Sequence, residues 1–177
     1  MTGPHDEATA GVPAGAAPQR SEGEARAAAA LAAAGVPYRI TRHGRVSSLA
    51  EAAAARGLSP ADVLKTIVVR RGDDDFLFVL VPGDRTISWP KLRALLGVSR
   101  MSMPDAATAK DVTGYERGTI TPFGSLRAWP VVADERVAGA RTVSIGAGAH
   151  GVAATLVGDD VVRVLGATVA DVTEPER

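Results

Sequence analysis

The segment from Tyr115 to Gly124 contains residues whose types and spacing suit the binding of a reacting group. It reads Tyr-Glu-Arg-Gly-Thr-Ile-Thr-Pro-Phe-Gly, so Gly118 and Pro122 are separated by three residues. Glycine permits a positive φ or a close backbone approach, and proline fixes its own φ, which restricts the path between them. Such a loop can present backbone N–H groups to a carbonyl or phosphate oxygen, although Gly/Pro segments also form ordinary turns.

A lysine elsewhere in the chain could supply a charge that complements these N–H groups. Lys65 opens the β-branched run Leu-Lys-Thr-Ile-Val-Val-Arg-Arg over residues 64–71, which is typical of a strand. A lysine at the edge of a sheet can act as a compact positive charge toward an anion. The alternative is a solvated lysine at the end of a strand.

Composition excludes several classes of site. The chain has 177 residues, enough for one domain with a real core, and its 20 basic and 20 acidic residues balance. Proteins that grip long nucleic acids are usually basic, so any such contact here should be small and local, for example with one terminus. There is no cysteine and there are three scattered histidines, which argues against disulfides, thiolate catalysis and metal sites.

The first 20 residues are rich in Ala, Gly and Pro, and we expect them to form a disordered tail ahead of a domain over residues 21–177. The N-terminus has Asp6 and Glu7 and no apolar core of a secretory signal. No stretch is long and apolar enough to span a bilayer. We therefore expect a cytoplasmic protein.

Periodicity and capping signals predict short, mixed elements. The runs at 64–71 and 76–81 flank the turn Gly-Asp-Asp-Asp and should form a central hairpin, whose second strand is apolar on both faces and should be deeply buried. This pattern favours an α+β domain of barrel-like or sandwich type. Helices are expected at 22–34, 47–56, 90–96, 104–112 and 159–165, and further strands at 36–40, 129–133, 141–145, 152–157 and 168–172.

Several segments resemble those of the YbaK family, which includes the prolyl-tRNA editing domain and its free-standing relatives. Residues 64–69 resemble the family's lysine-threonine strand, and residues 79–84 its second hairpin strand and turn. Residues 113–124 resemble its Gly-Tyr-X-X-Gly-X-X-X-Pro-X-Gly loop, and 143–146 with Gly151 its Val-Ser-Gly-Gly…Gly segment. The order and spacing of these segments, spread over about residues 31–172, carry the resemblance.

The resemblance implies a mixed β-barrel flanked by helices that hydrolyses the ester of a misacylated tRNA. The family's usual substrate is proline tRNA carrying cysteine or alanine, and some relatives act on serine or threonine esters. The implied partners are the 3′ end of an aminoacylated tRNA and, as a further option, an aminoacyl-tRNA synthetase. The resemblance implies neither a metal nor an organic cofactor.

The resemblance also assigns roles to individual residues. Lys65 would anchor the tRNA end or orient the ester, and the backbone amides from Gly118 onward would polarise the carbonyl as it becomes an oxyanion. Ser144 would offer a hydroxyl beside them. The substrate-binding set would comprise Thr66, Thr119, Ile120, Thr121, Pro122, Gly146 and His43.

Two of these positions need comment: His43 departs from the residue type that the family has there, and Thr66 indicates a class of substrate. His43 lies near a position where some relatives have a tyrosine beside the pocket, and it can equally be a surface histidine. Alanine-specific relatives often have asparagine after the lysine, whereas Thr66 follows it here, which favours cysteine, serine or threonine esters. Since no triad or carboxylate pair is apparent, we expect hydrolysis assisted by a group of the substrate, such as its free ribose hydroxyl.

Two other functions remain open from the sequence. The same pocket could belong to a non-catalytic module that binds a tRNA end or a synthetase. The run from Gly146 to Gly151 also matches Gly-X-Gly-X-X-Gly, with Asp171 about twenty residues further on, as in dinucleotide-binding proteins. The segment that follows is β-branched and interrupted by glycine, which argues against the helix that this motif requires.

Overall fold

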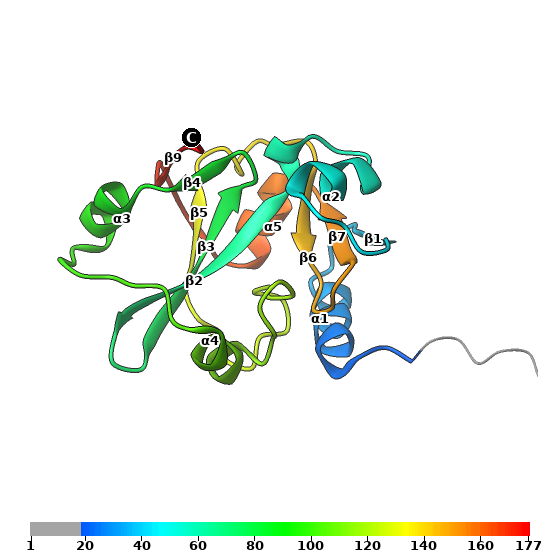
Figure 1. The fold of residues 1–177 in the computed structure, drawn as a ribbon, viewed down its shortest axis with the longest axis horizontal. Helices are drawn as coiled ribbons and strands as arrows, with labels where there is room; N and C mark the ends of the chain where they lie inside the picture. Colours follow the sequence, from blue (N-terminus) through cyan, green and yellow to red (C-terminus); the bar gives the residue numbers. More distant parts are fainter. Residues whose placement is uncertain (1–18) are drawn as a thin grey trace, which may run out of the picture.

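The computed structural model describes residues 19–177, and it confirms the expected α+β class (Figure 1). The expected tail lies outside the described residues except for its last two positions. No helix of the described part is long and apolar enough to cross a membrane. The helices are α1 (Glu22–Ala33), α2 (Leu49–Ala55), α3 (Trp89–Leu96), α4 (Ala106–Thr113) and α5 (Gly158–Val164), with a 3₁₀ turn at Pro60–Asp62.

The strands of residues 19–177 form three sheets. The largest has the order β2-β3-β5-β8, the second β1-β7-β6, and the third pairs β4 with β9. The strands are β1 (Arg39–Arg42), β2 (Leu64–Gly72), β3 (Asp75–Pro82), β4 (Arg85–Ile87), β5 (Val131–Asp134), β6 (Val143–Gly146), β7 (Val152–Leu156), β8 (Thr168–Ala170) and β9 (Thr173–Pro175).

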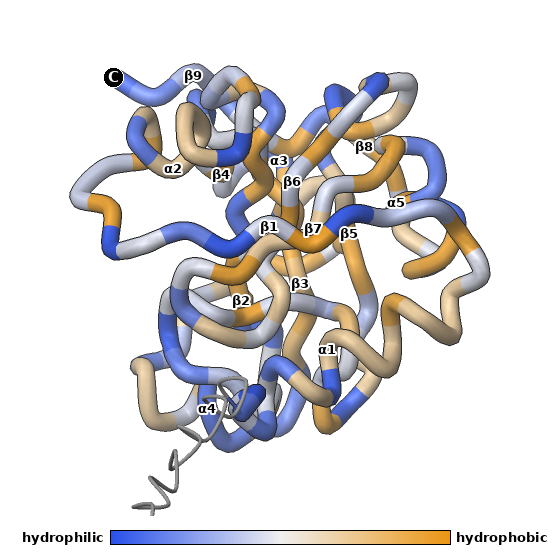
Figure 2. The backbone as a smooth tube through the Cα atoms, turned by 90° about the vertical axis from the view of Figure 1, so that its right-hand side faces the viewer, coloured by the Kyte–Doolittle hydropathy of each residue, from blue (hydrophilic) through white to orange (hydrophobic). Residues whose placement is uncertain are grey.

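The central hairpin of β2 and β3 is confirmed. β3 lies between β2, to which it is antiparallel, and β5, to which it is parallel. Alternate β3 side chains enter two different apolar clusters, Phe78 and Leu80 one of them and Leu77 and Val79 the other. Because both faces are covered, all of β3 after its first residue is buried, and its apolar course is visible in the centre of the molecule (Figure 2).

The hydrogen bonds among the described strands do not close into a barrel, so that part of the expected fold is not confirmed. The first two sheets meet instead at a single parallel bridge between Val63 and Ser144. β1 and β8 form outer edges of their sheets, which leaves the arrangement open on both sides.

One edge of β2 is held only at its two ends. Val63 bridges to β6, and Arg70 exchanges two backbone hydrogen bonds with Ser102, of 2.7 and 3.1 Å. In an antiparallel ladder the backbone groups of alternate residues face the same edge, so Thr66 and Val68 direct their N–H and C=O groups to the side that Arg70 uses. Between the two bridges this edge of β2 stays open.

Helix α2 starts where the sequence predicts. The Ser48 hydroxyl accepts a hydrogen bond from the Glu51 N–H (3.1 Å), and the Glu51 carboxylate accepts one from the Ser47 N–H (2.8 Å). This reciprocal arrangement is a variant of the capping box, and it satisfies N–H groups that a helix start would leave unpaired. It fixes the orientation of α2 beside the open edge of β2.

Two short strands were not expected from the sequence. Gly83 and Asp84 form a turn after β3, as the resemblance of residues 79–84 to a strand and turn implied, and the chain then continues into β4, which pairs with β9. The buried Asp134 carboxylate anchors the start of β9, because it accepts hydrogen bonds from the Val172 N–H (3.3 Å) and the Thr173 hydroxyl (2.8 Å). A strand of three residues that depends on a partner far away in the chain leaves little pattern in its own sequence from which it could be predicted.

The dinucleotide-binding interpretation of residues 146–151 is wrong. This glycine-rich segment is the turn between β6 and β7, which pair as an antiparallel hairpin. A dinucleotide fingerprint needs a helix directly after the glycines, so that the helix N-terminus can meet the pyrophosphate. A strand stands there instead.

Leu80→Ala should destabilise the domain by about 2–5 kcal/mol, because it leaves a cavity in the best-packed strand. The matched control is Leu95→Ala on α3, where the same change affects a side chain that is 40% exposed. The control should stay within about 0.5 kcal/mol of the wild type. Urea unfolding curves of the three proteins measure both, and equal losses would contradict the assignment of β3 to the core.

Candidate active site

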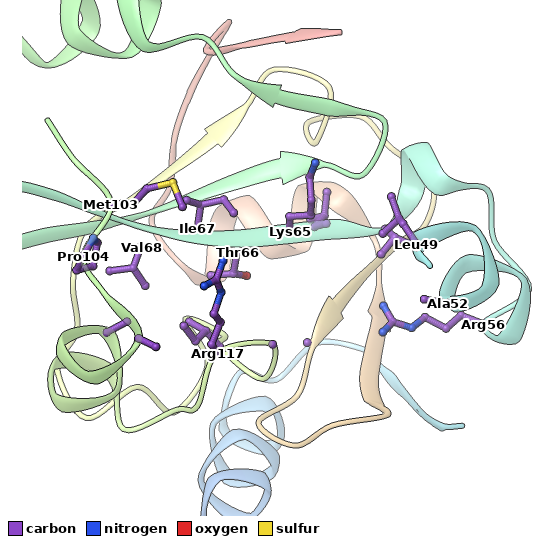
Figure 3. Close-up of a pocket in the computed structure, with 17 residues that line it drawn as sticks. Leu49, Ala52, Arg56, Lys65, Thr66, Ile67, Val68, Met103, Pro104 and Arg117 are labelled. Carbon is purple, nitrogen blue, oxygen red and sulfur yellow. The ribbon is translucent and has the colours of Figure 1, made fainter. Parts of the chain in front are cut away.

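A cavity of about 440 Å³ lies along the open edge of β2. The opposite walls come from α2, from residues 103–109 at the start of α4, and from the loop that contains Gly118 (Figure 3). Of the expected site residues, this cavity brings together Lys65, Thr66, Gly118, Ile120 and Gly146.

The loop before the cavity is shaped by its own side chains. Gly118 has φ of +88°, which confirms the need for glycine at this position. The Thr119 hydroxyl donates to the Glu116 carbonyl (2.7 Å), and the Thr121 hydroxyl accepts from the Phe123 N–H (3.3 Å). Both hydroxyls are therefore engaged within the loop.

Thr119, Thr121 and Pro122 do not line the cavity, so the structure gives them a loop-shaping position rather than a direct ligand contact. The buried Tyr115 adds a further tie, because its hydroxyl donates to the Phe123 carbonyl at 2.6 Å. Gly146 lies on the other side of the loop. A Cβ atom there would lie 3.3 Å from the Ile120 carbonyl, so a side chain at this position would push the loop a few tenths of an ångström away from β6.

Several loop amides are available to a ligand. Within residues 19–177, the N–H groups of Arg117, Gly118 and Ile120 have no hydrogen-bond partner, whereas that of Thr119 bonds the Glu116 carbonyl at 2.9 Å. These three residues line the cavity, whereas Glu116 and Thr121, whose N–H groups are also unpaired among residues 19–177, do not. Oxyanion binding by the loop needs N–H groups of this kind, and it stays a prediction.

Lys65 lines the cavity, but its ammonium group is directed away from the loop. Successive side chains of a strand point to opposite faces, and Figure 3 shows Lys65 and Thr66 on opposite sides of β2. The Lys65 Nζ donates to the Arg85 carbonyl and lies 3.6 Å from a carboxylate oxygen of Glu176. The expected facing pair of lysine and loop is thus not formed directly.

The cation on the loop side of β2 is Arg117, which the sequence analysis did not single out. It projects toward Thr66 beneath the strand (Figure 3). The Thr66 hydroxyl oxygen is buried and has no hydrogen-bond partner among the described residues. A charged residue directly before the glycine of the loop was the signal that could have identified Arg117.

His43 and Ser144 do not line the cavity, but a third residue connects both to it. Arg56, which follows the last residue of α2, donates from Nη1 to the Ser144 hydroxyl (3.1 Å) and from Nε to the His43 ring (3.4 Å). Ser144 is fully buried, so its hydroxyl cannot meet a ligand directly. A basic residue at a helix C-terminus is common, so Arg56 carried no distinctive signal in the sequence.

The cavity wall is cationic. Arg56, Lys65 and Arg117 contribute side chains, and none of the residues that line the cavity is Asp, Glu or His. Burial away from water lowers the pKa of Arg56 from its ordinary value. Among residues 19–177, no group of three or more His, Asp or Glu side chains is arranged to hold a metal ion.

Comparison with known families places this cavity in a biological context. Residues 43–164, more than half of the chain, match the sequence profile of the aminoacyl-tRNA editing domain. The chain belongs to the aminoacyl-tRNA editing domain family. The matched range contains all the residues of β2, α2, α4 and the loop described above, and the resemblance to the YbaK family is confirmed.

Curated relatives of this editing domain are proline–tRNA ligases. The chain is 35% identical to that of Heliobacterium modesticaldum over 94 residues, which are 53% of this chain and 16% of the ligase. It is 30% identical to that of Bacillus licheniformis over 102 residues, 58% of this chain and 18% of the ligase. The matched segment thus makes up less than a fifth of either ligase.

Solved structures share the fold. A protein described as a candidate trans-editing enzyme for prolyl-tRNA synthetase has a TM-score of 0.79 at 23% identity, with 88% of this chain and 99% of the other covered. A hypothetical protein has a TM-score of 0.77 at 25% identity, with 84% and 99% covered. The fold of the editing domain therefore exists as a free-standing chain.

Gly118→Ala should destabilise the domain by more than the cost of a positive φ alone, which is about 1–2 kcal/mol. The added Cβ would lie 3.2 Å from the His150 ring, so that ring or the loop must shift. Gly139→Ala is the matched control, since Gly139 has φ of +74° and no atom within 4 Å of an added Cβ. Thermal unfolding measures both, and a Gly118 variant as stable as the control would contradict this packing.

Proposed function

We propose that this chain is a trans-editing aminoacyl-tRNA deacylase, which hydrolyses the ester of a misacylated tRNA in the cavity beside β2. The proposed substrate is proline tRNA or a related tRNA that carries cysteine, serine, threonine or alanine. The proposed site of action is the cytoplasm, where charged tRNA is used. A synthetase for the same tRNA is a further proposed partner.

The observation that carries this proposal is that loop N–H groups without a hydrogen-bond partner belong to residues that line a cavity with cationic side chains and no acid. The 3′ end of a charged tRNA is a polyanion attached to a small ester. Arg117 at the loop and Lys65 beyond β2 suit its phosphates, while the N–H groups of Gly118 and Ile120 suit the ester carbonyl. Family membership supports the same substrate.

In the proposed reaction, a water oxygen adds to the ester carbonyl carbon. The carbonyl oxygen becomes an oxyanion, and the loop amides stabilise it by hydrogen bonds, each worth about 3 kcal/mol in comparable hydrolases. Collapse of this intermediate breaks the bond to the ribose oxygen, which takes up a proton. The products are the free amino acid and a tRNA with a free terminal hydroxyl.

Activation of the water must come from the substrate, because no acid or histidine lines the cavity. The neighbouring ribose hydroxyl can accept the hydrogen bond of the water and relay its proton to the leaving oxygen. Ser144 is too deeply buried for this role, and Arg56 already donates to its hydroxyl. Ser144 is therefore proposed to position Arg56 rather than to attack or activate.

Lys65 is proposed to bind a phosphate of the tRNA end in place of Glu176, its present ion-pair partner. Its side chain is 30% exposed, and Glu176 on its other side is 59% exposed, so the pair is solvated and contributes little. A phosphate of the tRNA end can take the place of Glu176 beside Lys65 while the Arg85 carbonyl keeps the ammonium in place.

The absence of a protein base from the cavity also favours a second candidate, a module that binds a tRNA end or a synthetase without turnover. Incubation with tRNA charged with a labelled amino acid separates the two. Release of the amino acid above the spontaneous rate supports the deacylase, and binding without release supports the module.

Lys65→Ala should lower kcat/KM for deacylation by about 100-fold, the order expected for loss of one charged hydrogen bond to a phosphate of the tRNA end. Lys110→Ala is the control, because Lys110 is exposed on α4 and pairs only with Glu116. Circular dichroism should show that both variants remain folded. A folded Lys65 variant with full activity would remove Lys65 from the site.

A further inference from the structure

Arg56 is a cation without an anionic partner. It extends from the end of α2 into the wall of the cavity (Figure 3), and no ion pair of the described residues includes it. Its nearest companions on that wall include the apolar side chains of Leu49, Ala52 and Val63. Arginine stays charged in proteins, so it cannot escape the cost of this environment by losing its proton.

The partners that Arg56 does have are neutral, and they fix its orientation. Guanidinium N–H groups can only donate, so His43 Nε2 accepts and its Nδ1–H can donate to the Gly44 carbonyl at 2.9 Å. The Ser144 hydroxyl oxygen accepts a second N–H. Of the five N–H groups of a guanidinium, three are left without a partner among residues 19–177.

Arg56 and Arg117 occupy different parts of the cavity wall. Arg117 is exposed, whereas Arg56 is half-buried. Figure 3 shows the two side chains apart, with Arg117 below Thr66 and Arg56 beside Ala52. On the proposed function, the exposed Arg117 is the cation suited to a phosphate of the tRNA end, and the half-buried Arg56 is the one suited to a small group attached to the ester.

We propose that Arg56 determines specificity by donating a hydrogen bond to an oxygen of the aminoacyl side chain. The proposal rests on the deacylase function above and narrows its substrate class to esters of small amino acids with a side-chain hydroxyl, of which serine and threonine are the simplest. A fixed donor in an apolar recess stabilises an oxygen acceptor, but offers nothing to the methyl group of alanine and little to a thiol.

The test is a deacylation panel on one tRNA charged in turn with serine, threonine, alanine and cysteine. Wild type should prefer serine and threonine esters to alanine ester by about 10- to 100-fold in kcat/KM, the value of a charge-assisted hydrogen bond. Arg56→Met should remove this preference by slowing the serine and threonine esters, and leave alanine ester within about 3-fold of wild type. Arg56→Lys should restore part of it.

Arg39→Met is the matched control, since Arg39 is exposed on β1 and outside the cavity, and the preference should survive there. Equal slowing of all four esters by Arg56→Met, with weaker binding of uncharged tRNA, would assign Arg56 to a phosphate and overturn the proposal. So would a wild type with no preference for hydroxyl side chains, even if the variants fail to fold. Absence of hydrolysis of every ester by wild type would instead reject the deacylase function itself.

Discussion

The site depends on one unfinished edge of a β-sheet. β2 is paired along its whole length with β3, but its other edge is bridged only at Val63 and at Arg70. Unpaired backbone groups in a protein interior are costly unless water or a ligand meets them. The gap between the two bridges therefore has to remain open to solvent, and the loop around Gly118, α2 and the start of α4 enclose it without filling it.

Electrostatics then decide what enters. The chain as a whole is neutral, yet two of the residues that line the cavity, Arg56 and Arg117, are cations without an ion-pair partner among residues 19–177, and no lining residue is Asp or Glu. Eleven of the 20 Lys and Arg residues, all of them in the described chain, form an ion pair, as Arg71 does with Asp75 and Lys91 with Asp171. Arg56 and Arg117 are among the nine that do not, and both line the cavity, so the local potential there is positive although the net charge gives no sign of it. A neutral protein can thus bind one end of a nucleic acid and ignore the rest.

Local patterns predicted the elements better than their assembly. The hairpin of β2 and β3, the cap of α2 and the glycine loop follow from neighbouring residues, and each was found at or near its expected position. The placement of Lys65 was harder to predict, because a strand alternates its side chains and Thr66, not Lys65, turns to the loop. Arg56 and its neutral partners come from three segments far apart in sequence, so neither spacing nor residue type could bring them together. β9 depends in the same way on the distant carboxylate of Asp134.

The N-terminal cap of α2 connects surface residues to the position of Arg56 in the cavity wall. A helix of seven residues is too short to be stable alone, so α2 relies on its cap and on burial of Ala52 and Ala53. Ser48 and Glu51 do not line the cavity, yet the cap that they form holds the helix from whose end Arg56 extends. The hydrogen bond from the Ser47 N–H lowers the pKa of Glu51, so the cap is strongest above the range where glutamate ordinarily titrates and weakens as the pH falls through it. Acid strong enough to protonate Glu51, and substitutions at the far end of α2, would both weaken the cap and with it the placement of Arg56 in the cavity wall.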